Sequence, residues 1–343
     1  MNRIEQYFKD KKCLIIAEIA QAHDGSLGTA HAYIDAAAKA GADSIKFQTH
    51  IADAESTLAD QWRVKFSYQD DTRFDYWKRM EFTAEQWAGL KKHADEKGII
   101  FLSSPFSIEA VELLENIGME AWKIASGEIS NTPMLNRIME TGKPIIISSG
   151  MSDVEELDKL VAKIKAKNIP LGILQCTTAY PTQPEKVGMN VMQEFKKRYD
   201  CPTGLSDHSG TIFAGLAGAA LGMDILELHI TFSRQMFGPD VVASITTEEL
   251  KWLVDGIRFI EKMNANPVVK DEAANDTKPM RKLFTKSIVA NSDLEAGIVI
   301  NESHLAYKKP GTGIPAEKYL DIIGKKLKHP VEYNHFFTEE DFI

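Results

Sequence analysis

Residues 14–19 read LIIAEI, an apolar run of strand length near the start of the chain. Further runs of this kind follow, most of them just after a helix-ending glycine or asparagine. They are residues 44–48 (SIKFQ), 99–102 (IIFL), 121–125 (AWKIA), 144–147 (PIII), 171–175 (LGILQ), 203–205 (TGL) and 224–228 (DILEL). Amphipathic helical patterns separate the runs, and strands that alternate with helices indicate a parallel sheet.

The number of repeats favours one architecture. Eight strand–helix units within the first 265 residues predict an α/β fold, a closed (β/α)8 TIM barrel. A doubly wound open sheet is the competing architecture, but no G-x-G-x-x-G follows the first run. The aromatic, charged segment 50–80 interrupts the rhythm after the second strand, which places it at the catalytic face of a barrel. We expect its aromatic side chains at 62–77 to pack within the loop or at a dimer contact.

The pattern changes after residue 265. The stretch NANPVVKDEAANDTKP is polar and contains proline, so we expect a barrel domain over 1–265 and a linker over 266–280. Residues 281–343 show short β-like pieces and glycine turns, which predict a small β-rich domain. A module of this size is marginal alone and is expected to dock on another surface.

Composition excludes several classes of protein. The 343 residues are 44% hydrophobic and carry a net charge of -9, which argues against disorder and against a nucleic-acid binder. A local basic pocket for an anionic small molecule remains compatible with that charge. The three cysteines are far apart, the N-terminus lacks a signal peptide, and no apolar stretch is long enough for a membrane span. These features predict a cytoplasmic protein.

Polar residues stand at the ends of the predicted strands, where a barrel places its chemistry. A buried, unpaired charge costs several kcal/mol, so these residues should meet partners or ligands. They are Glu18, Lys46, Gln48, Ser103, Ser104, Lys123, Ser126, Ser148, Ser149, Asp207, His208, Glu227 and His229.

Two histidines suggest a metal site. His208 and His229 end the seventh and eighth strands, which are neighbours in a barrel. Paired imidazoles with a nearby carboxylate or water suit a divalent cation such as Mn, Fe or Zn. A structural role for each histidine is the alternative, and the spacing does not show whether Asp207 or Glu227 is a ligand or orients an imidazole.

Two lysines suggest an anion site. Lys46 and Lys123 lie among apolar residues, where an ammonium group needs an anion. With Ser104, Ser126, Ser148 and Ser206 they would cradle a phosphate or carboxylate. The alternatives are that the lysines extend to solvent while the serines cap helices, or that one lysine forms a Schiff base.

Glu18 interrupts the first apolar run and is a candidate general acid/base or hydroxyl clamp. A buried structural hydrogen bond is the alternative role. Cys176 ends the sixth strand, and we expect it to serve in packing.

An ordered set of motifs resembles the sialic acid synthase family. The motifs are IAEIAQAHDGSLGTA (16–30), KFQTH (46–50), SSPFS (103–107), WKIASGEISNTP (122–133), PIIISSGM (144–151), QCTTAYPTQPE (175–185), GLSDHSG (204–210), LELHITF (226–232) and GPD (238–240). The tail KSIVANSDLEAGIVINESHLAYKKPGTGI resembles the antifreeze-like (SAF) domain that follows the barrel in that family.

The resemblance implies a metal-dependent condensation of phosphoenolpyruvate with an N-acetylhexosamine. His208 and His229 would hold Mn or Mg, and Glu18 would orient water or stabilise a developing cation. The phosphoenolpyruvate site would consist of Lys46, Ser104, Lys123, Ser126, Ser148 and Ser206. Contacts to the amino sugar would come from Gln48, Glu128, Tyr180 and Asp240. The family also implies a domain-swapped homodimer, with each C-terminal domain covering the partner's barrel.

The departures from the family pattern lie on the sugar side. The family's N-H-x-G appears as Ala22-His23-Asp24-Gly25, and Lys309 stands where an arginine often precedes Pro-Gly. N-acetylmannosamine is the first expectation for the acceptor. A 6-deoxy diacetamido hexose, giving legionaminic or pseudaminic acid, is the main alternative, and a phosphorylated acceptor is a third. A Schiff-base aldolase and a non-catalytic carbohydrate-binding protein are the rival functions.

Overall fold

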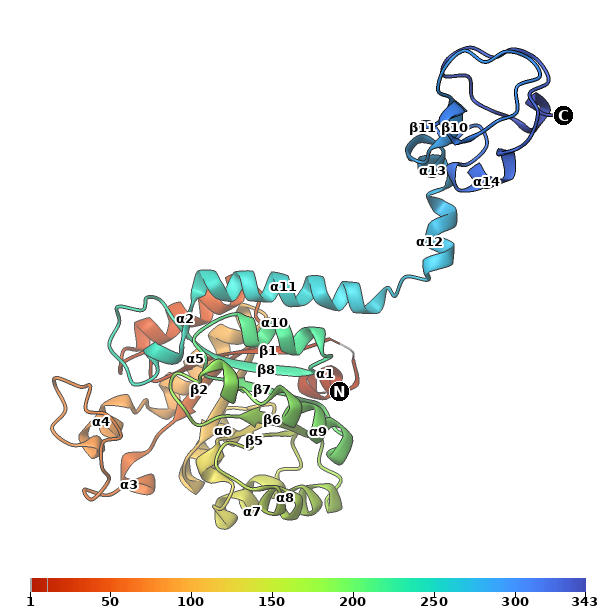
Figure 1. Ribbon diagram of the computed structural model, residues 1–343. Helices are drawn as coiled ribbons and strands as arrows, with labels where there is room; N and C mark the ends of the chain where they lie inside the picture. Colours follow the sequence, from red (N-terminus) through yellow and green to blue (C-terminus); the bar gives the residue numbers. More distant parts are fainter. Residues whose placement is uncertain (1, 11) are drawn as a thin grey trace. The chain divides into compact units, whose positions relative to one another are not determined.

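The computed structural model describes residues 2–10 and 12–343. The chain divides into two compact units, Met1–Ala265 and Asn266–Ile343. Figure 1 shows the elements of both units, coloured along the sequence. Within the described residues, no helix has the length and apolar character needed to span a bilayer.

The first unit is a ring of parallel strands. The strands are β1 (Leu14–Ala20), β2 (Ser44–Thr49), β3 (Ile100–Pro105), β4 (Trp122–Ile124), β5 (Ile145–Ser148), β6 (Leu171–Cys176), β7 (Thr203–Asp207) and β8 (Ile225–Thr231), with β9 (Ile245–Thr246) beside β8. Their hydrogen-bonded order is β3-β2-β1-β8-β7-β6-β5-β4, and β3 also contacts β4, so the ring is nearly closed. The predicted TIM barrel is confirmed.

Helices connect the strands and cover the outside of the ring (Figure 1). They are α2 (Leu27–Ala40), α5 (Ala84–Glu96), α6 (Ile108–Asn116), α7 (Thr132–Glu140), α8 (Val154–Ala166), α9 (Met189–Tyr199), α10 (Phe213–Ala220) and α11 (Thr247–Ala265). Local sequence sets their ends: the Ser26 hydroxyl accepts from the Thr29 N–H at the start of α2, and Gly41 ends α2 with φ 86°.

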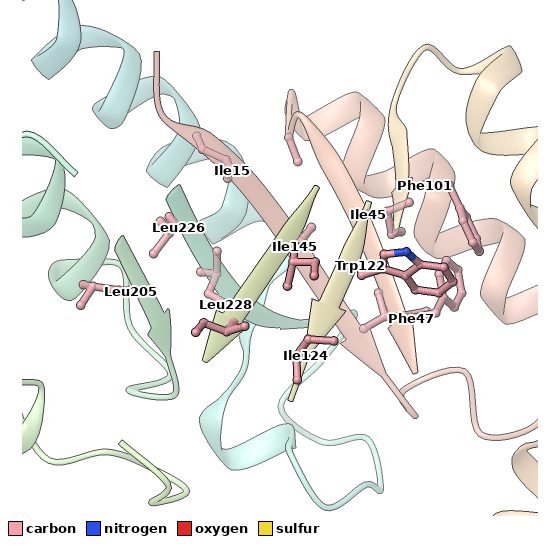
Figure 2. Packing of buried hydrophobic residues seen from close by; sticks show 14 of the residues in the cluster. Ile15, Ile45, Phe47, Phe101, Trp122, Ile124, Ile145, Leu205, Leu226 and Leu228 are labelled. Carbon is pink, nitrogen blue, oxygen red and sulfur yellow. The ribbon is translucent and has the colours of Figure 1, made fainter. Parts of the chain in front are cut away.

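Two layers of apolar side chains stabilise the barrel, because successive strand residues point to opposite faces. Outward-facing side chains, among them Ile15, Phe47, Trp122 and Leu226, form the large core between strands and helices (Figure 2). Inward-facing side chains form a second core, comprising Ile4, Leu14, Ile16, Ile100, Leu102, Ala121, Ile146, Leu174 and Ile225. Since Ile4 belongs to α1 (Arg3–Lys9), that helix packs against the amino-terminal end of the barrel interior.

The excursion after β2 contains the short helices α3 (Ala52–Glu55) and α4 (Arg73–Met80), coloured orange in Figure 1. Arg79 pairs with Asp70 inside the excursion and attaches it to the barrel through Asp24 of the loop after β1. Gly25 in that loop has φ 76°, and a Cβ there would lie 2.6 Å from the Arg79 carbonyl oxygen. The close backbone approach therefore requires glycine at this position.

The second unit begins with helices where the sequence predicts a linker. These are α12 (Lys270–Asp276) and α13 (Lys278–Phe284). An antiparallel pair, β10 (Ser287–Ala290) and β11 (Leu305–Lys308), follows with α14 (Tyr319–Ile322). Ile288, Ile300 and Phe337 lie in a separate hydrophobic core of this unit.

Candidate active site

The inner face of the barrel becomes polar toward the carboxyl ends of the strands. Glu18 follows the apolar Ile16 on the same face of β1 and pairs in register with Lys46 of β2 and His229 of β8. We call this set the polar layer. Its side chains are Glu18, Lys46, Gln48, Ser104, Lys123, Ser148, Ser206, Glu227 and His229.

Lys46 lies at the centre of the polar layer. Its ammonium nitrogen is 2.5 Å from Glu18 Oε2, 3.8 Å from Glu227 Oε2, and donates to Ser104 Oγ at 3.2 Å. Burial alone would lower the pKa of Lys46, but the two carboxylates outweigh it and raise that pKa. Burial, with the charge of Glu227, raises the pKa of Glu18 to about 7 despite Lys46.

Lys123 forms the second buried cation. It donates to Ser148 Oγ at 2.7 Å and lies 3.4 Å from Glu227 Oε1, which also accepts from Ser206 Oγ at 3.2 Å. Burial lowers the pKa of Lys123 even though Glu227 opposes the shift. Burial would raise the pKa of Glu227, but Lys123 and Lys46 together lower it.

The two predicted histidines lie together. The ring centroids of His208 and His229 are 5.2 Å apart, and the Tyr180 ring stacks on His208 at 4.3 Å. His208 Nδ1 is 3.0 Å from the Thr177 carbonyl oxygen, which can only accept. Nδ1 therefore carries the proton, and the lone pair of His208 is on Nε2, 3.3 Å from the Tyr180 hydroxyl.

Both imidazoles are held neutral. Burial, with the neighbouring imidazole of His229, lowers the pKa of His208 to about 4. Burial and Lys46 lower the pKa of His229 to about 3. A neutral imidazole with an oriented lone pair is the form that binds a metal ion.

The donor set fits a metal held by few protein ligands. Among the described residues there is no cluster of three or more His, Cys, Asp or Glu side chains with the geometry of a metal site. Asp207 is engaged with the Ser209 hydroxyl, which donates to it at 2.9 Å. His208 and His229 would therefore bind an ion that completes its shell with substrate or water, which suits Mn better than a closed structural zinc site.

A cavity of about 410 Å³ opens beside the polar layer. All four predicted sugar contacts line it, and so does His229. The four are Gln48, Glu128, Tyr180 and Asp240. Burial raises the pKa of Asp240 and of Glu128. The cavity therefore combines hydrogen-bonding groups for a polar ligand with direct access to one of the two histidines.

Segment 50–80 supplies much of the cavity wall. Trp62, Arg63 and Trp77 line it, and the Arg63 guanidinium lies 4.4 Å from the Tyr180 ring centroid and 3.5 Å from Asp240. The predicted packing within the loop is confirmed, because the Trp62 ring lies 5.7 Å from that of Tyr76, which lies 5.2 Å from that of Trp77. The cavity-lining position of Trp62 and Trp77 is an additional role that the expectation missed. Their alternation with charged residues in a loop at the catalytic face was the available signal.

Ser126 and Lys309 belong neither to the polar layer nor to the cavity lining. Ser126 packs against the loop after β5. A Cβ added to Gly150 of that loop would lie 2.4 Å from the Cβ of Ser126. Lys309 belongs to the second unit, where its ammonium group lies 5.2 Å from the Phe284 ring. Cys176 is buried, with its sulfur 4.0 Å from His208 Nδ1.

Comparison with known proteins identifies the family. Residues 33–268 match the model of the NeuB family, and residues 285–343 match the SAF domain. This chain belongs to the NeuB family. The resemblance seen in the sequence motifs is confirmed, and so is the SAF domain after the barrel.

Several relatives of this NeuB family member are named as synthases. The N,N'-diacetyllegionaminic acid synthase of Campylobacter jejuni is 36% identical, with 92% of this chain and 96% of the relative covered. The N-acetylneuraminate-9-phosphate synthase of Homo sapiens is 34% identical, with 96% of this chain and 92% of the relative covered. The crystal structure of an N-acetylneuraminic acid synthetase from Leptospira borgpetersenii, in complex with citrate, gives a TM-score of 0.69 at 29% identity. The match covers 78% of this chain and 92% of the synthetase chain. The chain is thus an enzyme of the sialic acid synthase type.

Proposed function

We propose that the protein condenses phosphoenolpyruvate with the aldehyde of an N-acylated amino hexose and releases phosphate. The observation that carries the proposal is the polar layer: two buried ammonium groups with serine hydroxyls, beside two neutral histidines and below the cavity. An enol ester bound to the lysines would lie next to a carbonyl bound near His229.

The lysine side of the layer suits a compact dianion or trianion. Lys46 and Lys123, with the hydroxyls of Ser104, Ser148 and Ser206, offer converging donors in a site removed from water. Charge-assisted hydrogen bonds to phosphate and carboxylate oxygens are strong in such surroundings. Glu18 and Glu227 balance the two ammonium charges while no anion is bound.

The reaction that fits this arrangement has two stages. C3 of phosphoenolpyruvate attacks the aldehyde carbon, forming the C–C bond and leaving an oxocarbenium ion at C2. Water adds to C2, and the resulting tetrahedral phosphate ester loses phosphate by C–O cleavage to give a 2-keto acid. Glu18, as a carboxylate in the centre of the layer, would stabilise the cation and orient the water.

A divalent cation, Mn or Mg, is part of the proposal. His208 and His229 would hold it, and it would act as a Lewis acid toward the sugar aldehyde. The Thr177 carbonyl fixes the tautomer of His208, and the Tyr180 ring fixes the plane of that imidazole.

The cavity favours an acceptor without a phosphate group. Its carboxylate side chains outnumber its guanidinium groups, and Arg63 and Arg73 already pair with Asp240 and Asp60. The aromatic side chains of segment 50–80 suit acyl methyl groups. We therefore propose N-acetylmannosamine or a 6-deoxy diacetamido hexose as the acceptor, and the second would make the protein a legionaminic or pseudaminic acid synthase.

We further propose a cytoplasmic homodimer in which the SAF domain of one protomer covers the partner's barrel, as the family resemblance implies. The cytoplasmic location is supported by the three cysteines, which are all free among the described residues. A small domain with its own core and the Lys309 motif agrees with a covering role.

A Schiff-base aldolase is the second candidate, because the lowered pKa of Lys123 is what an imine-forming lysine requires. The two functions differ in their products. A panel of acceptor sugars, incubated with phosphoenolpyruvate and Mn, should release phosphate only when a suitable amino sugar is present, and a chelator should stop the release. Borohydride trapping of pyruvate on Lys123 without phosphate release would instead support the aldolase.

A further inference from the structure

A continuous line of hydrogen bonds joins the polar layer to the cavity wall. Gln48 Nε2 donates to Glu18 Oε1 at 3.1 Å, and Gln21 Nε2 donates to Gln48 Oε1 at 2.6 Å. The same Gln21 nitrogen lies 2.6 Å from His50 Nε2, and His50 Nδ1 lies 2.5 Å from Glu55 Oε1. Gln21 and His50 are buried, so bulk water does not replace these contacts.

The direction of every bond follows from the Glu18 end. When Glu18 is ionised, with Lys46 2.5 Å from its Oε2, its Oε1 accepts, so Gln48 must present its NH2 group to Glu18 and its oxygen to Gln21. Gln21 must then donate with one N–H to Gln48 and with the other to His50. His50 Nε2, 2.6 Å from the Gln21 nitrogen, must therefore carry a lone pair, and its longer approach to Gln48 Oε1, at 3.4 Å, is then a contact without a hydrogen bond.

The Glu55 end requires the same arrangement. Its carboxylate accepts a hydrogen bond from the His50 Nδ1–H, and a neutral imidazole with Nδ1 protonated has its lone pair on Nε2. Both ends thus agree on one orientation of each amide. The agreement follows from the chemistry of the two carboxylates and does not depend on how the amide atoms are assigned.

Packing and backbone geometry hold the line in place. His50 is stacked between Trp77, at 4.1 Å, and Phe106, at 4.5 Å. β1 changes register between Glu18 and Ala20, and Ala20 has φ 46°, in the left-handed region that alanine disfavours. Strained backbone next to a candidate active site indicates that the position of the following residue, Gln21, matters.

We propose that His50, with Glu55, is a positioning residue. It fixes the orientation of the Gln21 and Gln48 amides, so that Gln48 donates a hydrogen bond to Glu18 Oε1. The inference rests on the catalytic role of Glu18 proposed above. Without the lone pair of His50, the Gln21 amide can rotate and the Gln48 amide can follow. Gln48 would then lose the donor that holds its oxygen away from Glu18, and its hydrogen bond to Glu18 Oε1 would be held less firmly.

Kinetics of three variants test the inference. His50→Phe keeps a ring between Trp77 and Phe106 but removes both nitrogens, so kcat should fall about 10- to 100-fold while the KM for phosphoenolpyruvate changes less than about threefold. His50→Gln retains an acceptor for Gln21 and should recover most of kcat. Glu55→Gln no longer selects one tautomer of His50, so its kcat should lie between those of His50→Phe and His50→Gln.

A surface histidine provides the matched control. His93 also pairs with a carboxylate, Asp35 at 2.9 Å, and contacts another ring, His31, but it lies outside the cavity. His93→Phe should leave kcat unchanged. Wild-type kcat in His50→Phe would overturn the inference, as would equal activity of folded His50→Gln and His50→Phe, with folding checked by thermal unfolding.

Nitrogen NMR of histidine-labelled protein tests the line without any turnover. The His50 signals, assigned by their loss in His50→Phe, should show a protonated Nδ1 and an unprotonated Nε2. The opposite tautomer or a charged ring would overturn the inference. Absence of phosphate release with every acceptor would count against the proposed function instead, and the NMR result would still decide the hydrogen-bond arrangement.

Discussion

Glu18 Oε2 and Lys46 Nζ lie 2.5 Å apart on neighbouring strands, both almost completely buried in the barrel. An ion pair in this position costs desolvation energy that hydrophobic side chains would not. Its retention at the floor of a cavity is explained by chemistry: the lysine is available to an anion and the carboxylate to a developing cation. The predictions below test the parts of this arrangement.

Replacing the Glu18 carboxylate should impair catalysis more than binding. Glu18→Gln keeps the volume of the side chain and removes its charge, so kcat should fall about 100- to 1,000-fold. The KM for phosphoenolpyruvate should change little, because the lysines remain. Steady-state phosphate release measures both constants. Glu155→Gln, on the exposed face of α8, is the control, and an unaltered kcat in Glu18→Gln would contradict the role of Glu18.

Removing the second buried cation should affect one substrate selectively. Lys123→Gln takes away the ammonium group next to Ser148, so the KM for phosphoenolpyruvate should rise about tenfold or more, corresponding to about 1.4 kcal/mol. The KM for the sugar should stay within a factor of about three. Steady-state kinetics with each substrate varied in turn tests this. An increase confined to the sugar would place the anion site elsewhere.

His23 should make folding stability depend on pH. Burial lowers the pKa of His23 to about 3, and its Nδ1 accepts from the Gly25 N–H at 3.1 Å. The unfolded chain takes up a proton below about pH 6.5 and the folded chain does not, so this contribution is present above pH 6.5 and is lost as pH falls toward 3.

The loss from His23 should approach about 1.4 kcal/mol for each pH unit below 6.5. His23→Asn removes the titrating group, so the free energy of unfolding should fall less steeply between pH 6.5 and 5 than in the wild type. Urea denaturation at several pH values measures this slope. Identical slopes in the two proteins would show that His23 is not held neutral.

Lys309 tests the contribution of the second unit. If the SAF domain covers a barrel, Lys309→Ala should raise the KM for the acceptor sugar about tenfold and leave the KM for phosphoenolpyruvate unchanged. Lys308→Ala is the neighbouring control, because Lys308 donates within its own unit to Tyr333 at 2.9 Å. Equal effects of the two substitutions would argue against a sugar contact by Lys309.

The sequence predicts the polar layer well because one physical rule governs it. Side chains alternate along a strand, so Glu18, Lys46 and His229 had to share the barrel interior once their strands were recognised. The seventh strand was predicted too short, ending at residue 205, because Ser206 and Asp207 are polar. They continue the strand to Asp207, where the Ser206 hydroxyl reaches Glu227.

The parts that the sequence did not predict depend on loops and irregular backbone. Gln21 reaches the cavity through the register change before Ala20, and no periodicity reveals such a bulge. Arg63 and Trp77 lie in segment 50–80, whose path depends on tertiary contacts such as those of Arg79. Loop residues of this kind are positioned by the whole fold rather than by their neighbours in sequence.

The central claim is that a C–C bond forms between phosphoenolpyruvate and an amino sugar with cleavage of the C–O bond to phosphate. Phosphoenolpyruvate labelled with oxygen-18 at the bridging C2 oxygen tests it most directly, with the products of turnover analysed by mass spectrometry. The account predicts that the label leaves with phosphate and that the keto acid takes its new oxygen from water. Label retained in the keto acid, or phosphate released without a sugar, would contradict it.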